Sequence, residues 1–326
     1  MTDWTTKVWG IDASDAVTCN FSNATKNGLG FAIHRIGQGT QALDPQWPDF
    51  VQQAYDQKVP VVGGYYVLDP VYYVEKLQSL TKLREIDKWL PVALDEQYQR
   101  LVSGITNKAM QILAIDVEIF KDYQGNVIDP TWCAETAFQF MVRVKKNIAS
   151  VNKNIKQVVI YTGKWYIDNY APNMKNWMNS LDDPWVAQYT KSGYLTLTDW
   201  AQLKDHYPPA TINGHQGPDY LYAKNWKLWQ WWGDGVASKD FLGQQSKPCS
   251  LDVNFFNGNL DDLCEWAGVK APTNPTPDPD PDPQPDPDPT PDPGTGGSID
   301  LAVTNARLQT IIDMLEPISA FFERIK

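Results

Sequence analysis

Two carboxylates stand at alternate positions in an apolar stretch of the chain. The stretch runs from residue 112 to 120, and Asp116 and Glu118 are its only acids. Side chains two positions apart on a strand share a face, so Ala114 lies beside the two acids and apolar residues occupy the opposite face. Burial of a carboxylate is costly and raises its pKa. The pair therefore indicates acid–base chemistry; the alternative is a salt-bridged strand end that faces solvent.

Short apolar runs predict eight strands in all. They cover residues 8–12, 28–37, 59–67, 112–120, 157–163, 184–189, 227–232 and 250–256. Helices are predicted at 45–58, within 71–108 and at 130–151, and they thin out after the fifth strand. This order favours an α/β protein with a closed parallel-type barrel, in which the chemistry lies at the C-terminal ends of the strands. The polar residues near those ends are Asp12, Tyr65, Asp116, Glu118, Tyr161 and Asp252.

Composition narrows the possible partners. The net charge is -11, and 14 Trp and 15 Tyr supply flat surfaces for sugar rings or, alternatively, a large aromatic core. An acidic chain without a basic patch is not expected to bind nucleic acid. Three histidines and four cysteines show no metal-ligand spacing, so no metal is expected. The sequence has no secretory signal and no apolar run long enough to span a membrane.

The C-terminal part of the chain has a different character. Residues 271–297 form a Pro/Asp-rich linker, and we expect its alternating Pro-Asp run from Pro277 to Pro293 to be an extended spacer of roughly 50 Å. Residues 298–326 carry apolar side chains at heptad spacing and predict a short amphipathic helix, kinked or split at Pro317. The helix is expected to form a homo-oligomer or to dock onto another protein or surface; a disordered tail is the remaining alternative. Residues 1–270 then form the catalytic barrel.

Six short motifs occur in an order that resembles glycoside hydrolase family 25, the Chalaropsis-type lysozymes or N-acetylmuramidases. They are Gly10-Ile-Asp-Ala-Ser14, Asp116-Val-Glu118, Val159-Ile-Tyr-Thr-Gly163, Trp185-Val-Ala-Gln-Tyr189, Leu228-Trp-Gln230 and Leu251-Asp-Val-Asn254. The resemblance covers residues 5 to about 267. It implies a flattened TIM-like (β/α)5β3 barrel and cleavage of the β-1,4 bond between N-acetylmuramic acid and N-acetylglucosamine in peptidoglycan.

The resemblance also implies roles for the acids. Glu118 matches the general acid, Asp116 the second acid of the motif, and Asp12 and Asp252 the other acids of the cleft. Strand spacing alone leaves retention and inversion open. The family is similar to retaining enzymes, and assistance by the substrate's 2-acetamido group, held by Asp116, is a hypothesis. The sequence departs from the family pattern after Ser14, which affects one subsite wall.

Aromatic and amide residues near the predicted strand ends are candidates for sugar binding. Tyr65, Tyr161, Trp185 and Trp229 could stack on or orient sugars, and Gln188, Gln230 and Asn254 could bind acetyl or hydroxyl groups. Alternation prevents Gln188 and Tyr189 from both pointing inward. Arg35 could neutralise part of the acid cluster or form a structural salt bridge. Hydrolysis of this kind requires no metal and no cofactor.

These features predict a peptidoglycan hydrolase with lysozyme activity. The lack of a signal sequence predicts a bacteriophage endolysin or virion-associated lysin, made in the host cytoplasm and acting on the cell wall. One alternative is a non-catalytic glycan-binding or virion structural protein on the same barrel. The other is a chitinase-like glycosidase, which would carry further acids where Ile112 and Ala114 stand.

Overall fold

The computed structural model describes residues 4–14, 21–70, 83–121, 125–178, 184–190, 196–197, 208, 217–218, 225–237 and 249–272. The chain divides into two units, Met1–Thr273 and Asn274–Lys326, and the description that follows concerns the first. The predicted C-terminal helix, and all but two residues of the predicted linker, lie outside the described residues. The predicted domain boundaries therefore stay predictions.

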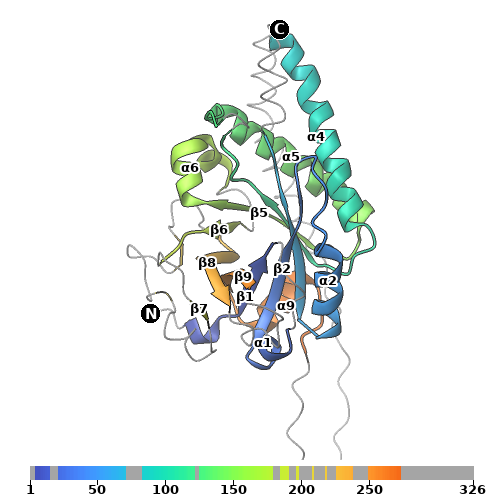
Figure 1. Ribbon diagram of the computed structural model, residues 1–326, viewed down its shortest axis with the longest axis vertical. Helices are drawn as coiled ribbons and strands as arrows, with labels where there is room; N and C mark the ends of the chain where they lie inside the picture. Colours follow the sequence, from blue (N-terminus) through green and yellow to red (C-terminus); the bar gives the residue numbers. More distant parts are fainter. Residues whose placement is uncertain are drawn as a thin grey trace, which may run out of the picture. The chain divides into compact units, whose positions relative to one another are not determined.

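Eight strands of the described chain close into a barrel (Figure 1), in the order β1-β2-β3-β4-β5-β6-β8-β9 and back to β1. The closed α/β barrel is therefore confirmed. A further short strand, β7, pairs with the far end of β8. The strands are β1 (Trp9–Ala13), β2 (Leu29–Gln38), β3 (Val61–Val67), β4 (Ile112–Asp116), β5 (Gln157–Gly163), β6 (Trp185–Ala187), β7 (Thr196–Leu197), β8 (Leu228–Ala237) and β9 (Cys249–Phe256).

The last strand departs from the parallel order of the other seven strands of the barrel. Strands β1 to β6 and β8 pair parallel with one another around the barrel. Strand β9 lies between β8 and β1 and pairs antiparallel with both. The alternation of side chains reads the same in either direction, so the sequence pattern carried no information on strand direction. As a result, Asp252 reaches the active end of the barrel from the first half of its strand rather than from the C-terminal end.

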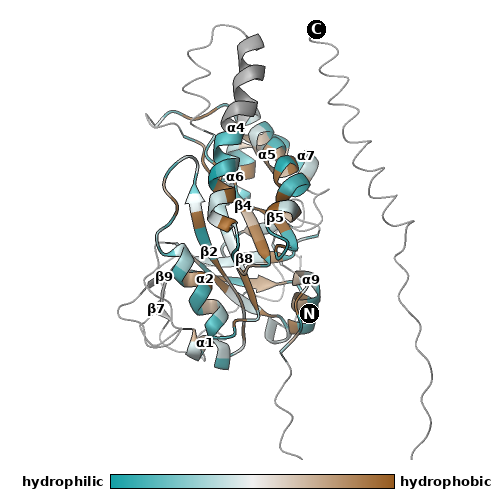
Figure 2. Ribbon diagram, turned by 90° about the vertical axis from the view of Figure 1, so that its right-hand side faces the viewer, coloured by the Kyte–Doolittle hydropathy of each residue, from teal (hydrophilic) through white to brown (hydrophobic). Residues whose placement is uncertain are grey.

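The two faces of the strands belong to two separate cores. In β4, Ile112 and Ala114 pack inside the barrel, while Leu113 and Ile115 pack outward with helix residues such as Phe140 of α5. This confirms the predicted alternation. Figure 2 shows the same division in the helices, whose apolar and polar residues occupy different sides. The inward face of β4 therefore points Asp116 toward the barrel axis.

Helices surround the barrel, all but α9 on its outer side (Figure 1). They are α1 (Ser22–Lys26), α2 (Trp47–Asp56), α4 (Leu83–Ile105), α5 (Pro130–Val151), α6 (Lys164–Tyr170), α7 (Lys175–Met178) and α9 (Leu260–Ala267), with 3-10 turns η1 (Trp4–Thr6) and η2 (Pro172–Met174). Helix α5 has the predicted bounds, and Asp129 caps it by accepting a hydrogen bond from the Thr131 amide at 2.8 Å. The predicted helical region 71–108 is described only from residue 83.

Helix α9 closes the end of the barrel opposite to the acids. Its residues Leu263 and Ala267 are fully buried and belong to the core inside the barrel. A capping box starts the helix, because the Asn259 side chain accepts from the Asp262 amide at 3.0 Å and Asp262 accepts from the Asn259 amide at 2.9 Å. The sequence prediction missed this helix, although Asn-x-x-Asp before an apolar residue is a start signal for a helix.

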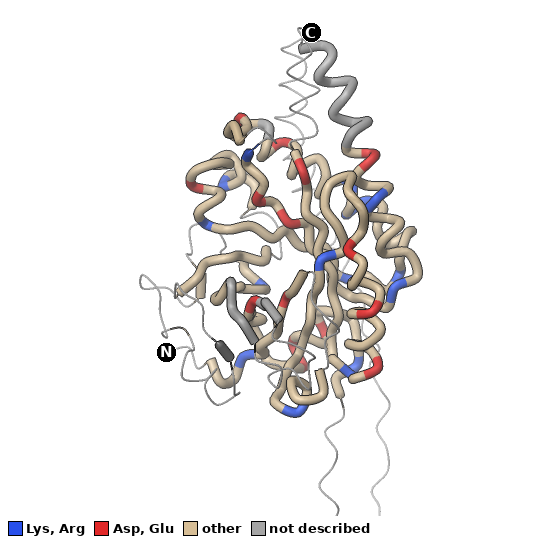
Figure 3. The backbone as a smooth tube through the Cα atoms, viewed as in Figure 1, with Lys and Arg blue, Asp and Glu red and all other residues tan. Residues whose placement is uncertain are grey.

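Charge is mixed over the described part of the chain. Figure 3 shows basic and acidic residues interspersed along the backbone. Among the described residues, no helix combines the length and apolar character needed to span a membrane.

Candidate active site

A cavity of about 170 Å³ brings the four predicted acids together. Its lining consists of Asp12, Tyr65, Asp116, Glu118, Tyr161, Trp185, Tyr189, Gln230 and Asp252. These residues come from β1, β3, β4, β5, β6, β8 and β9 or from positions directly after those strands. Eight of the twelve predicted site residues therefore lie around one space.

Strand register explains how the acids meet. Asp12 of β1 lies directly opposite Asp252 of β9. Asp116 is the last residue of β4 and pairs in register with Tyr161 of β5. Glu118 follows two residues later and is half-buried, whereas Asp116 is only 3% exposed. Glu118 thus lies nearer the mouth of the cavity than Asp116.

Gln230 connects the acids on the β1–β9 side of the cavity. Its Nε2 donates to Asp12 Oδ2 at 3.0 Å and to Asp252 Oδ2 at 3.0 Å. Its Oε1 accepts from the hydroxyl groups of Tyr161 at 2.8 Å and Tyr189 at 3.0 Å. Since the two hydroxyls occupy the oxygen side of the amide, the nitrogen side is held toward the carboxylates.

Asn254 and Trp185 form a second support beneath Asp12. Asn254 Nδ2 donates to Asp12 Oδ2 at 2.6 Å, and the Trp185 indole N–H donates to Asn254 Oδ1 at 2.9 Å. The Trp185 ring is 1% exposed and lies edge-on to Tyr161, with ring centroids 4.6 Å apart. Asn254 is fully buried, so it positions Asp12 from behind and does not line the cavity.

Burial shifts the acids toward their protonated forms. It raises the pKa of Asp12 to about 6, against the opposing effect of the hydrogen bonds from Asn254 and Gln230. The pKa of Asp116 lies well above its ordinary value, chiefly through burial and then through the negative charges of Glu118 and Asp12. Asp116 Oδ1 is buried without a hydrogen-bond partner, so nothing on that oxygen offsets the cost of charge.

Arg35 acts on the site from a distance. Its guanidinium contacts Asp44, with Nη2 3.1 Å and Nε 3.2 Å from Asp44 Oδ2. Its positive charge lowers the pKa of Asp116 and of Tyr65, although larger effects raise both. The two readings of Arg35 in the sequence, a structural salt bridge and a counter-charge for the acids, therefore both describe it, and it does not line the cavity.

Two predicted sugar-binding residues lie away from the cavity. Trp229 is fully buried on the outer side of β8, packed against Trp4 and Trp226 with ring centroids 5.2 and 6.1 Å away. Its indole N–H donates to the Gln188 backbone oxygen at 3.0 Å, and Gln188 is absent from the cavity lining. The physical reason is alternation: Gln230 points inward, so its neighbour Trp229 points outward.

Tyr189 is the lining residue that the prediction passed over in favour of Gln188. Trp185 and Ala187 belong to the core inside the barrel, and Tyr189 continues that face by alternation. It is 47% exposed and bonds to Gln230. Counting inward positions from Trp185 would have identified it in the sequence.

Comparison with known proteins adds a family to this geometry. None of the curated protein sequences matches the chain. The solved structures that share the fold include the following three. A bacterial lysozyme from Streptomyces coelicolor has 20% identity over 81% of this chain and 98% of its own, with a TM-score of 0.51. A family 25 glycosyl hydrolase from Bacillus anthracis has 14% identity over 82% and 96%, with a TM-score of 0.50. A lysozyme of the same family from Aspergillus fumigatus has 18% identity over 80% and 99%, with a TM-score of 0.50.

The family pattern described as "Glycosyl hydrolases family 25" matches residues 11–240, which is well over half of the chain. The match includes three of the four acids and ends before Asp252, which the antiparallel strand β9 brings opposite Asp12. The resemblance found in the sequence is thereby confirmed, and the chain belongs to glycosyl hydrolases family 25 and is a glycoside hydrolase.

Proposed function

We propose that this enzyme is a peptidoglycan muramidase that cleaves the β-1,4 bond between N-acetylmuramic acid and N-acetylglucosamine. The observation that supports the proposal is the convergence of four carboxylates, from three strands and the segment after β4, in one polar cavity. Glycoside hydrolysis requires one acid to protonate the leaving oxygen and a second group across the anomeric carbon. The names of the structural relatives, two of them lysozymes, agree with this substrate.

Glu118 is the proposed general acid. It lies nearer the cavity mouth than Asp116 and carries one more methylene than an aspartate, so it can reach the glycosidic oxygen. Asp116 is its proposed partner, which orients the substrate's 2-acetamido group or stabilises positive charge on the sugar. Asp116 Oδ1 is buried and has no partner in the protein, so substrate binding would have to expose this oxygen before it accepts from an acetamido N–H. Repulsion and burial keep a proton on such a pair to higher pH than on separate carboxyls.

Asp12 and Asp252 line the opposite wall, where the hydrogen bonds from Gln230 hold both. They are proposed to bind sugar hydroxyls and to add negative charge opposite the Asp116–Glu118 pair, and Tyr65, Tyr161, Trp185 and Tyr189 are proposed to shape the sugar site. The substrate places the action of the enzyme at the bacterial cell wall. A bacteriophage source and synthesis without a secretion signal stay predictions.

The test is digestion of purified peptidoglycan by the wild type and by Glu118→Gln, with mass spectrometry of the released ends. We expect new reducing ends on muramic acid with the wild type and their loss with the variant. Glu96→Gln is the matched control, because Glu96 is exposed on α4. Release of peptides alone would contradict cleavage of the glycan, and release of nothing would favour a binding or structural protein. Equal turnover of an N-acetylglucosamine polymer would favour a chitinase-like enzyme.

A further inference from the structure

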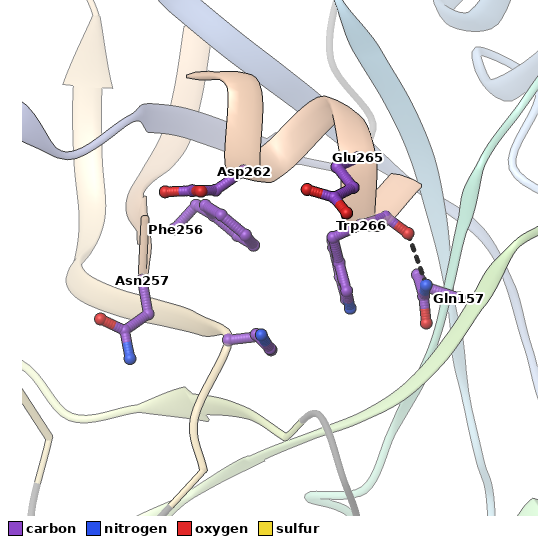
Figure 4. A pocket seen from close by; sticks show the side chains of 7 residues that line it. Gln157, Phe256, Asn257, Asp262, Glu265 and Trp266 are labelled. Carbon is purple, nitrogen blue, oxygen red and sulfur yellow. Dashed lines mark hydrogen bonds between the residues drawn. The ribbon is translucent and has the colours of Figure 1, made fainter. Parts of the chain in front are cut away.

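A second cavity lies at the other end of the barrel, where helix α9 closes it (Figure 4). Its volume is about 460 Å³, and its lining consists of Gln157, Lys227, Phe256, Asn257, Asp262, Glu265 and Trp266. It shares no residue with the acid cavity. Gln157 lines the second cavity and Tyr161 lines the acid cavity. The two residues are four positions apart on β5, which corresponds to roughly 13 Å along the strand. The two cavities are thus independent spaces.

One wall of this second cavity is aromatic. The Trp266 and Phe256 rings are tilted by 38° with centroids 5.4 Å apart. Figure 4 shows the Trp266 ring extending from α9 into the space, next to Glu265 of the same helix. The Trp266 indole nitrogen is buried and has no hydrogen-bond partner in the protein. Because this nitrogen has almost no accessible surface, the part of Trp266 that faces the cavity is its apolar ring.

The surrounding groups offer both acceptors and donors. Asp262 and Glu265 supply carboxylates one turn apart on α9, and Lys227 supplies an ammonium group before β8. The Asn257 side chain is already fixed, since it accepts from Lys7 Nζ at 2.8 Å and donates to the Trp226 oxygen at 3.2 Å. Gln157 Nε2 donates to the Trp266 backbone oxygen at 2.5 Å. These contacts make the wall rigid before a ligand arrives.

The combination of charges selects the class of ligand. Asp262 and Glu265 are balanced by the ammonium groups of Lys227 and of Lys7, which donates to Asn257, and a balanced set of charges favours a neutral ligand over an ion. An aromatic face flanked by acceptors and donors suits a pyranose ring, which has an apolar C–H face and hydroxyl groups at its edge. The volume lies within the range of small-ligand sites. We propose that this cavity binds a neutral sugar unit of a cell-wall glycan, as a site separate from the acids.

A second sugar site would change how tightly the enzyme binds a polymeric glycan. Two contacts on one glycan network convert the second binding event into an intramolecular one and raise the overall affinity without a new catalytic group. The proposal does not depend on the roles assigned to Glu118 and Asp116. It rests on the proposed function only for the source of the sugar.

The test uses the full chain with Glu118→Gln, labelled at its tryptophan indole nitrogens, and the trisaccharide of N-acetylglucosamine as the probe. Trp266→Phe, which keeps an aromatic ring, assigns the Trp266 indole signal in the NMR spectrum. We expect a saturable shift of that signal on titration with the trisaccharide. Glu265→Ala should weaken the apparent affinity about tenfold, as expected for the loss of a hydrogen bond to a charged group. Glu96→Ala, on the exposed face of α4, should not.

Two outcomes would overturn the proposal. One is a Trp266 signal that stays in place up to the solubility limit of the sugar. The other is a shift that the sugar does not produce. A shift with Nα-acetyl-lysine amide, which keeps its side-chain ammonium, would assign the cavity to a cation, and a shift with phosphate would assign it to an anion. A Trp266 shift together with failure of the wild type to cut peptidoglycan would support the second site while contradicting the muramidase function.

Discussion

Asp116 combines burial, a raised pKa and an oxygen without a partner, and this combination has a cost in stability. A carboxyl whose pKa is raised by folding stabilises the folded state fully below its ordinary pKa of 3.8, and this contribution is lost as the pH rises. At neutral pH the folded protein therefore carries the penalty of a buried acid. Active sites commonly retain such a penalty in exchange for function.

Asp116→Asn removes this penalty. We expect the free energy of unfolding at pH 7 to rise by about 1–2 kcal/mol while turnover of peptidoglycan falls about 100-fold. The gain should disappear near pH 3, where the acid is protonated in both states. Thermal unfolding of both proteins from pH 3 to pH 8 measures the difference. A gain independent of pH, or a loss at pH 7, would contradict the assignment of the raised pKa to Asp116.

Gln230→Glu tests the hydrogen-bond network. The substitution keeps the shape of the side chain but replaces the donor to Asp12 and Asp252 with a negative charge. The pKa of Asp12, about 6, should rise further, and kcat/KM at pH 7 should fall about tenfold or more. NMR titration of the Asp12 carboxyl carbon measures the pKa. Gln188→Glu, outside the cavity, is the control, and equal Asp12 midpoints in the two variants would contradict the network.

Single residues were predicted best where their chemistry breaks the local pattern. Asp116 and Glu118 stand out because an apolar strand does not need them, and all four acids do line one cavity. Trp229 and Gln188 were chosen for residue type alone, and the strand alternation that separates them from the cavity was already visible in their neighbours. The hydrogen bond from Gln230 to Asp12 joins residues 218 positions apart, and no local pattern reports such a contact.

At the scale of elements, a glycine in β1 gives room to the strand beside it. A methyl group on Gly10 would lie 2.4 Å from the Phe31 ring, and Phe31 is fully buried inside the barrel. Gly10 stands two positions before Asp12 on the same face. The strand therefore requires the absence of a side chain directly beneath an acid.

Gly10→Ala should consequently affect both stability and activity. We expect a loss of about 1–3 kcal/mol in the free energy of unfolding, as for other overpacked cores, with reduced turnover because Asp12 moves with its strand. Chemical denaturation and peptidoglycan digestion measure the two effects. Gly125→Ala is a comparison that isolates backbone strain, because Gly125 has φ +87° and nothing within 4 Å of the added methyl. Full stability and activity of Gly10→Ala would contradict the packing argument.

Helices and strands were predicted well where their hydrophobic pattern extends over many residues or where a capping residue marks their boundary. Helix α5 starts at Pro130 after an aspartate cap and has the predicted bounds, and β5 also matches residue for residue. Strand β4 ends earlier than predicted, at Asp116. The prediction was too long because the apolar residues continue past the last residue of β4 that pairs with a neighbouring strand. The sequence pattern made no prediction of the direction of β9, because direction depends on how the chain returns to the sheet, which side-chain alternation does not encode.

At the scale of the whole molecule, the tail at residues 298–326 carries its own prediction. If its heptad pattern drives assembly, the full chain should be an oligomer by light scattering and a chain ending at Lys270 a monomer. The barrel ends before that point, with α9 at Ala267 and its glycine cap at Gly268, so the shortened chain retains the described fold. Equal masses would rule out assembly through the tail.

The pairing of β9 with β1 has a consequence for the synthesis of this enzyme. The bond from Asn254 to Asp12 joins positions 242 residues apart, and contacts of such long sequence separation form late in folding. A nascent chain that has not yet emerged past β9 lacks Asp252 and Asn254, the donor to Asp12 from that strand, and its first strand has an open edge. Hydrolytic activity should therefore arise only after nearly the whole barrel has left the ribosome.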